Sequence, residues 1–169
     1  MTIAEIIAEK NAKAKDKTIA LSSGLLNGEF SMQQVLETAQ QLKDAAKAIL
    51  IEALEYATKE RPQLMQAAVF DFLIECLQSK SPRVKMESAR TIANCAALFP
   101  AHTEAAYYSL IKNAGDEGTV LRWSVATAMN ELSKTKTWKT AWNQTIRQLH
   151  DSEEKNSIRK IYAAVLKKA

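Results

Sequence analysis

Few side chains in this sequence have the types and the spacing that catalysis or metal binding needs. The chain has two cysteines, Cys76 and Cys95, and no histidine lies at metal-ligand spacing from either of them. It also lacks a glycine-rich phosphate loop, a Ser/His/Asp arrangement and clustered carboxylates. Both cysteines fall in apolar patterns typical of helices, which predicts buried, reduced thiols. We therefore predict a protein that is not an enzyme, with no catalytic residues, no metal site and no cofactor.

Basic and aromatic side chains gather in the last third of the chain. Residues 1–120 carry 13 basic and 15 acidic side chains, whereas residues 121–169 carry 10 and 4, a net charge of +6. Such an end could bind phosphates without sequence preference, or it could simply be solvated. Trp123 follows Arg122 and lies off the apolar stripe of its predicted helix. An exposed indole there could anchor a partner or stack on a base, but we favour a packing role against neighbouring helices.

Composition restricts the elements that could position these residues. The chain has 169 residues, of which 47% are apolar and 25% charged, typical of one globular domain. It contains 27 alanines against 4 glycines and 3 prolines, which excludes an all-β fold and predicts an all-α one. No apolar stretch is long enough to span a bilayer, and the first residues read as an amphipathic helix rather than a secretory signal. We expect a soluble, cytoplasmic protein with no membrane partner.

A repeated pattern carries most of the information. Four stretches begin with an apolar residue followed by Lys or Arg, at offsets of 38, 37 and 37 residues: Ala46-Lys47, Val84-Lys85, Leu121-Arg122 and Ile158-Arg159. Five positions after the apolar residue comes Ala89, Ala126 or Ala163, with Ile51 in the first copy. A small side chain there lets packed helices approach closely. So steady a period predicts stacked units, each too small to bury its apolar face alone.

Each unit contains signals for two helices. Ser31 with Gln34 forms a capping-box pattern at the start of the first unit, and Ser81-Pro82 predicts the start of a second helix in the next unit. In the last unit, Asp151 with Glu154 predicts another capping box, and Trp138 and Trp142 are expected in the core. We predict an N-terminal helical cap over residues 1–30 and helical hairpins over about 31–62, 63–100, 101–135 and 136–169, one domain overall.

The repeated basic residue has a structural interpretation. Asp116 lies six residues before Arg122, and Glu153 lies six residues before Arg159. Each acid could pair with the base across the hairpin turn or reach the next repeat. We favour such a ladder of charges, which sets the register between repeats, although each exposed pair would contribute little stability.

On these residues the units resemble HEAT-like repeats, an armadillo-like α-α superhelix (solenoid). The resemblance rests on Val84-Lys85 with Ala89, Leu121-Arg122 with Ala126, and Ile158-Arg159 with Ala163, and it covers about residues 31–169. It implies a concave surface lined by the second helix of each hairpin, which holds another macromolecule. One branch of the family, the DNA alkylation glycosylases, lines that face with Arg, Lys and Trp and excises bases.

Two functions follow as hypotheses. The first is a non-enzymatic scaffold or adaptor that binds another protein on the concave face. The alternative is a nucleic-acid-binding protein that uses the basic last third. A repeat-built glycosylase is a remote third reading, because the acids nearest Trp123, Asp116 and Glu117, fall in a predicted turn. The candidate interaction surface is Lys85, Arg122, Trp123, Arg159 and Lys160.

Overall fold

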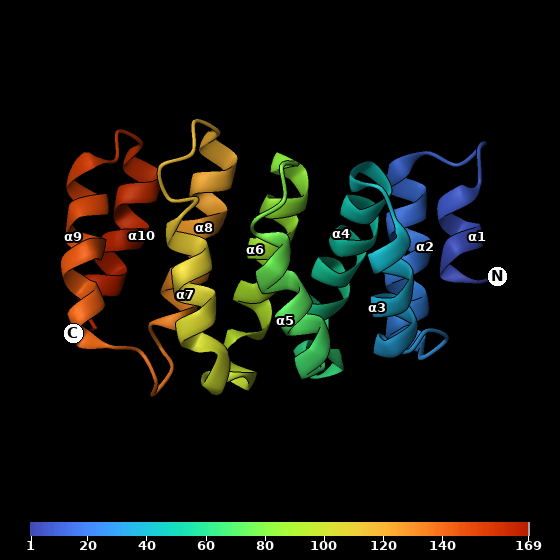
Figure 1. The fold of residues 1–169 in the computed structure, drawn as a ribbon, viewed down its shortest axis with the longest axis horizontal. Coiled ribbons are helices and arrows are strands. Elements are labelled where there is room, and N and C mark those ends of the chain that lie inside the picture. The colour runs from blue at the N-terminus through green and yellow to red at the C-terminus, as the bar shows by residue number, and fades with distance from the viewer. Residues whose placement is uncertain (169) are drawn as a thin grey trace.

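The chain folds as a row of helix pairs (Figure 1). The computed structural model describes residues 1–168, and within that range it contains ten α-helices and no strand. Consecutive helices form antiparallel pairs, and the two ends of the chain lie at opposite ends of the row. The first helices of the pairs are α1 (Ile3–Ala8), α3 (Met32–Gln41), α5 (Ala67–Cys76), α7 (Thr103–Ile111) and α9 (Asn143–Ser152). The second helices are α2 (Ala14–Asn27), α4 (Asp44–Glu60), α6 (Pro82–Cys95), α8 (Thr119–Leu132) and α10 (Asn156–Leu166). The all-α solenoid expected from the repeat is confirmed.

Two of the three predicted helix starts are confirmed. The Ser31 side chain accepts a hydrogen bond from the Gln34 backbone while Gln34 bonds back to Ser31, and the Ser81 hydroxyl accepts from the Val84 backbone. The capping box at Asp151 and Glu154 is wrong. Helix α9 continues through Asp151 to Ser152, and α10 begins after Lys155, which makes no side-chain cap.

The four copies of the repeat share one position within the second helix. The apolar residue lies three residues after the N-cap in each copy, with N-caps at Lys43, Ser81, Gly118 and Lys155. Helix α2 has the same register, because its N-cap is Lys13 and the equivalent dipeptide is Asp16-Lys17. Lys17 Nζ donates to the Ile7 carbonyl at 2.6 Å and so ties α2 to α1. The sequence pattern missed this copy because Asp16 stands where the others are apolar.

The second helices form the inner side of the row. Neighbouring second helices pack against one another more extensively than neighbouring first helices do. Ala89 and Ala126 are fully buried where these helices meet, as is Ile51. One hydrophobic core runs from Ile3 to Val165 through every pair, so no pair has a core of its own. In residues 1–168 no helix is both long and apolar enough to cross a bilayer.

Both cysteines are buried and free, as the sequence predicted. Burial raises the pKa of the Cys76 thiol to about 11 and that of the Cys95 thiol to about 12. At neutral pH both therefore remain protonated, which makes them poor nucleophiles.

Candidate functional site

Helices α6, α8 and α10 carry a partly solvent-exposed stripe, which we call the second-helix face. Residues one before, two after and six after the repeated apolar position fall on one side of a helix with 3.6 residues per turn. In α6 these residues are Arg83, Met86 and Arg90, and in α8 they are Val120, Trp123 and Thr127. Seven large hydrophobic residues are exposed in residues 1–168, and four of them lie on second helices: Ile19, Tyr56, Val120 and Trp123. Of these four, Val120 and Trp123 occupy positions of the second-helix face.

The structure divides the five residues predicted as an interaction surface. Trp123 is 41% exposed, so the packing role that we favoured from the sequence does not account for it. Lys160 occupies the equivalent position in α10 and is also exposed. Lys85, Arg122 and Arg159 lie one residue earlier in their helices, about 100° around the helix axis, and so point away from the second-helix face.

Arg122 joins the last two repeats. Its Nε donates to Glu153 Oε2 at 3.0 Å and its Nη2 to Glu153 Oε1 at 3.2 Å, while Nη1 donates to the Asp116 carbonyl at 2.9 Å. The two side chains are only 15% and 5% exposed. Burial raises the pKa of Glu153, but the hydrogen bonds from Arg122 and the backbone outweigh it, and the pKa lies below its ordinary value. The base therefore reaches the acid of the next repeat, one of the two pairings expected from the sequence.

A regular ladder of such pairs is absent from residues 1–168. Lys85 precedes Asp116 by the same 31 residues that separate Arg122 from Glu153, but within residues 1–168 it forms no ion pair. Asp116 Oδ1 instead accepts from the Gly118 backbone at 2.8 Å. Arg159 is exposed and has no ion pair with the part of the chain that the structure describes. The pair at Arg122 is therefore particular to the junction between the last two repeats.

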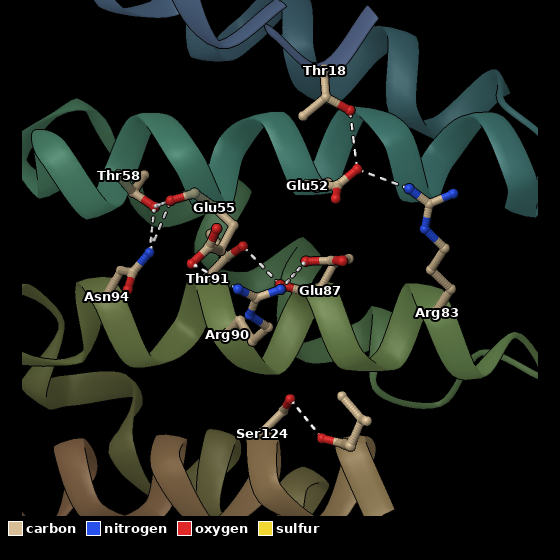
Figure 2. Close-up of polar contacts among 11 residues, drawn as sticks. Thr18, Glu52, Glu55, Thr58, Arg83, Glu87, Arg90, Thr91, Asn94 and Ser124 are labelled. Carbon is tan, nitrogen blue, oxygen red and sulfur yellow. Dashed lines mark hydrogen bonds and ion pairs between the residues drawn. The ribbon is translucent and has the colours of Figure 1, made fainter. Parts of the chain in front are cut away.

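Two buried carboxylates and one half-buried arginine lie together between α4 and α6 (Figure 2). Arg90 lies 3.6 Å from Glu55 and 3.4 Å from Glu87, measured between guanidinium nitrogens and carboxylate oxygens. Both carboxylates are buried, and Glu55 Oε2 has no hydrogen-bond partner in the described residues. Burying two carboxylates is costly unless a cation lies close to them, and here both depend on Arg90.

Further polar contacts tie α4 to both of its neighbours. Glu52 Oε2 accepts from Thr18 of α2 at 3.0 Å and from Arg83 Nη2 of α6 at 2.8 Å. Asn94 Nδ2 donates to the Glu55 carbonyl and to Thr58 Oγ1 (Figure 2). Between α6 and α8, by contrast, no side-chain hydrogen bond or ion pair occurs in residues 1–168, and the Ser124 hydroxyl bonds within its own helix. The packing between α6 and α8 is thus free of directional polar contacts.

The buried carboxylate of Glu87 should make stability depend on pH. Burial raises its pKa from an ordinary value of 4.5 to about 7, with Arg90 opposing the shift and Glu52 and Glu55 adding to it. Because the folded state then binds this proton more tightly than the unfolded state, the free energy of unfolding should fall as pH rises from about 5 to about 7. Glu87→Gln should flatten this fall in urea titrations at pH 5, 6, 7 and 8. An equally steep fall in the variant would contradict the assignment.

The basic last third is partly neutralised by contacts within the chain. Lys134 pairs with Glu131, Lys139 with Glu104, and Arg122 with Glu153. Lys168 donates to the backbone and side-chain oxygens of Asn130. The net charge of +6 already counts Glu131 and Glu153, so only the pair of Lys139 with Glu104, an acid outside the segment, lowers the positive charge further.

The remaining candidate residues have structural contacts. Trp142 is buried and stacks on Tyr107 with ring centroids 4.1 Å apart. Trp138 lies before α9, half-buried, and donates from Nε1 to Asn143 Oδ1. His102 Nδ1 lies 2.6 Å from Asp71 Oδ1. Among residues 1–168 there is no group of three or more His, Cys, Asp or Glu side chains placed to hold a metal ion.

Sequence reasoning missed the arginines of the second-helix face. Arg83 and Arg90 were not predicted, because the repeated pattern has its basic residue one position after the apolar one. The signal that could have identified them is helical spacing. Residues one before, two after and six after the repeated apolar residue lie on one side of the helix, and in α6 and α8 they are at least partly exposed.

Comparison with known proteins supports the architecture. No family model and no curated protein matches the sequence. A designed armadillo repeat protein superposes with a TM-score of 0.66 at 13% identity, covering 98% of this chain and 80% of that one. A structure of computationally designed armadillo repeat proteins for modular peptide recognition gives the same TM-score and coverage at 16% identity. Identities this low establish the fold alone. The chain has the architecture of an armadillo-like α-α solenoid.

Proposed function

We propose that the protein is a non-enzymatic scaffold or adaptor that binds another protein on its second-helix face. The observation that carries the proposal is the placement of Val120 and Trp123, two large apolar side chains exposed side by side in register on helix α8 of that face. Exposed large apolar side chains gathered on one surface indicate a binding site. Protein-binding sites draw most of their affinity from a few such anchors, above all Trp, Tyr and Arg.

Peptide display with a matched pair of variants tests the proposal. Peptides selected on the wild-type protein should lose at least about 30-fold in affinity on Trp123→Ala, because losing an interface tryptophan costs about 2 kcal/mol or more. Tyr108→Ala is the control, since Tyr108 is exposed on the first helix α7. Peptides that bind both variants as tightly as the wild type would place the binding site elsewhere.

Nucleic acid is the second candidate partner, favoured by the exposure of Trp123 and Lys160 at equivalent positions. Fluorescence anisotropy with labelled single- and double-stranded oligonucleotides at several salt concentrations tests it. Binding that weakens log-linearly with salt would support the nucleic-acid reading. No binding at low salt would eliminate it and would also remove the glycosylase reading, leaving the protein-binding scaffold.

The proposal extends to repeat type, organisation and compartment. The bond of Arg122 to the acid of the following repeat supports assignment to HEAT-like repeats in particular. We keep residues 1–30 as an N-terminal cap, in which α1 and α2 cover the apolar side of the next pair. Two buried free thiols suit a reducing compartment such as the cytoplasm.

A further inference from the structure

Arg83 and Arg90 each contact carboxylates of the protein on one side and are partly exposed to solvent on the other. Arg83 is 43% exposed and uses Nη2 to reach Glu52, whereas Arg90 is 31% exposed and faces Glu55 and Glu87. A guanidinium has five N–H donors, and these contacts occupy only one or two of them on each arginine. Both side chains therefore keep donors available to a partner on the second-helix face.

The carboxylates beneath the arginines fix them in place. Glu52 Oε2 accepts a hydrogen bond from Thr18 Oγ1 at 3.0 Å. Glu55 and Glu87 are buried, so packing restricts the motion of their side chains. An arginine already fixed loses little conformational freedom when it binds, so it favours a partner more than a free surface lysine does. The two arginines are more exposed than the carboxylates they face, because Glu52 is 20% exposed and Glu55 and Glu87 are buried.

Apolar side chains lie beside the two arginines. Arg83 and Arg90 are seven residues apart on α6, which is about 10 Å along the helix axis, and Met86 lies between them. On the neighbouring helix α8, Val120 is equivalent in register to Arg83, and Trp123 is equivalent to Met86. Val120 and Trp123 are 61% and 41% exposed. The surface thus combines two cations about 10 Å apart with an apolar area next to them.

We propose that this surface of α6 and α8 binds an acidic peptide. Two carboxylates about 10 Å apart bond to Arg83 and Arg90, and an apolar side chain between them packs on Trp123 and Val120. A peptide helix with acids at positions i and i+7 and apolar residues at i+3 and i+4 has this spacing on one face. The inference rests on the proposed function, since it uses the same face and specifies the chemistry of the protein partner.

A peptide suits this surface better than a nucleic acid does. A nucleic-acid strand needs a continuous track of cations, because it carries a charge at every nucleotide. Here Met86 interrupts Arg83 and Arg90, and Val120 beside them is aliphatic, so Trp123 is the one residue of this surface whose ring could stack on a base. Four of the ten cations in residues 121–169 also have partners within the chain.

The first experiment compares labelled helical peptides by fluorescence anisotropy. The probe is an alanine-based peptide with Glu at i and i+7 and Leu and Trp at i+3 and i+4, and its control has Gln in place of both Glu residues. The acidic peptide should bind the wild-type protein at least about tenfold more tightly than the Gln peptide, because charge-assisted hydrogen bonds are the stronger ones. Raising the salt concentration should narrow the difference.

Protein variants then locate the site. Arg83→Gln should remove most of the preference for the acidic peptide, while Arg159→Gln, which changes an exposed arginine away from the face, should leave it unchanged. Arg90 is tested as Arg90→Lys, since loss of its charge would leave Glu55 and Glu87 buried without a cation and could unfold the protein. Arg90→Lys should reduce the preference while circular dichroism shows intact folding.

The outcomes separate this inference from the proposed function. Equal binding of the acidic and Gln peptides, with both weakened by Trp123→Ala, would overturn the acidic preference and leave the binding face intact. An acidic preference unaffected by Arg83→Gln and Arg90→Lys would overturn the site. Failure of both these probes and displayed peptides to bind would overturn the proposed function as well. If an oligonucleotide displaces the acidic peptide and binds more tightly than it does, the ligand of this surface is a nucleic acid, and the peptide proposal is overturned.

Discussion

Replacing Arg122 by methionine should lower the free energy of unfolding by about 3–5 kcal/mol. The substitution keeps much of the aliphatic stem but leaves Glu153, only 5% exposed, without the guanidinium that bonds to both of its oxygens. It also removes the donor that bonds to the Asp116 and Glu117 carbonyls in the turn before α8. Urea unfolding followed by circular dichroism measures the loss.

Arg159→Met is the matched control for this prediction. Arg159 occupies the same repeat position in α10, but it is exposed and has no ion pair in residues 1–168, so its replacement should change stability by no more than about 0.5 kcal/mol. Acid should also reduce the effect of Arg122→Met. In the wild type the pKa of Glu153 is lowered, and its stabilising contribution disappears as pH falls through that value. A loss below about 1 kcal/mol at pH 7 would show that the pair behaves as an exposed one.

Replacing Phe70 by alanine should cost about 3–5 kcal/mol. Phe70 is fully buried in α5, stacks on Phe99 with centroids 4.7 Å apart, and meets the edge of the His102 ring at 5.8 Å. Phe99 and His102 belong to the connection that leads into α7, so the cavity would open at a junction between repeats. The measurement is again urea unfolding, with Leu98→Ala as control.

Leu98→Ala, the control, compares the cost of truncating an exposed apolar side chain with that of truncating the buried Phe70 in the same region. Leu98 is 44% exposed, and its truncation should cost no more than about 1 kcal/mol. All three tryptophans lie in residues 121–169, so their fluorescence reports the C-terminal part, whereas circular dichroism reports every helix. A loss for Phe70→Ala no larger than that for Leu98→Ala would contradict the packing described here.

The fold was predictable because its signals are local. The period of 37 to 38 residues, Ser31 with Gln34, and Ser81-Pro82 are properties of short segments, and they identified helix pairs without any knowledge of their contacts. The capping box at Asp151 and Glu154 was wrong because Asp151 still belongs to α9, which ends at Ser152, and α10 begins only at Asn156. A four-residue pattern does not determine where the preceding helix ends.

The candidate site was only partly predictable. Trp123 and Lys160 lie on the second-helix face, but Arg122 serves the junction between repeats, since one residue of helix changes direction by about 100°. The burial of Glu55 and Glu87 could not be inferred either. In the sequence, Glu55 and Glu87 look like charged residues on the solvated sides of their helices. Only the packing of α4 against α6 shows that both carboxylates are buried and that the positive charge of Arg90 lies close to each.

The uneven distribution of polar contacts has a mechanical consequence. Hydrogen bonds and ion pairs are directional, so the joint between α4 and α6 is stiff and resists rotation as well as separation. The joint between α6 and α8 is held by non-directional apolar packing, and it resists separation while permitting small rotations. The same two repeats are joined by polar contacts on their first-helix side, where His102 Nδ1 meets Asp71 and Asn113 Nδ2 donates to the Leu77 carbonyl, so we expect small rotations about that side. Arg83 and Arg90 then move with one rigid half and Val120 and Trp123 with the other, so that flexing adjusts the width of the surface between them.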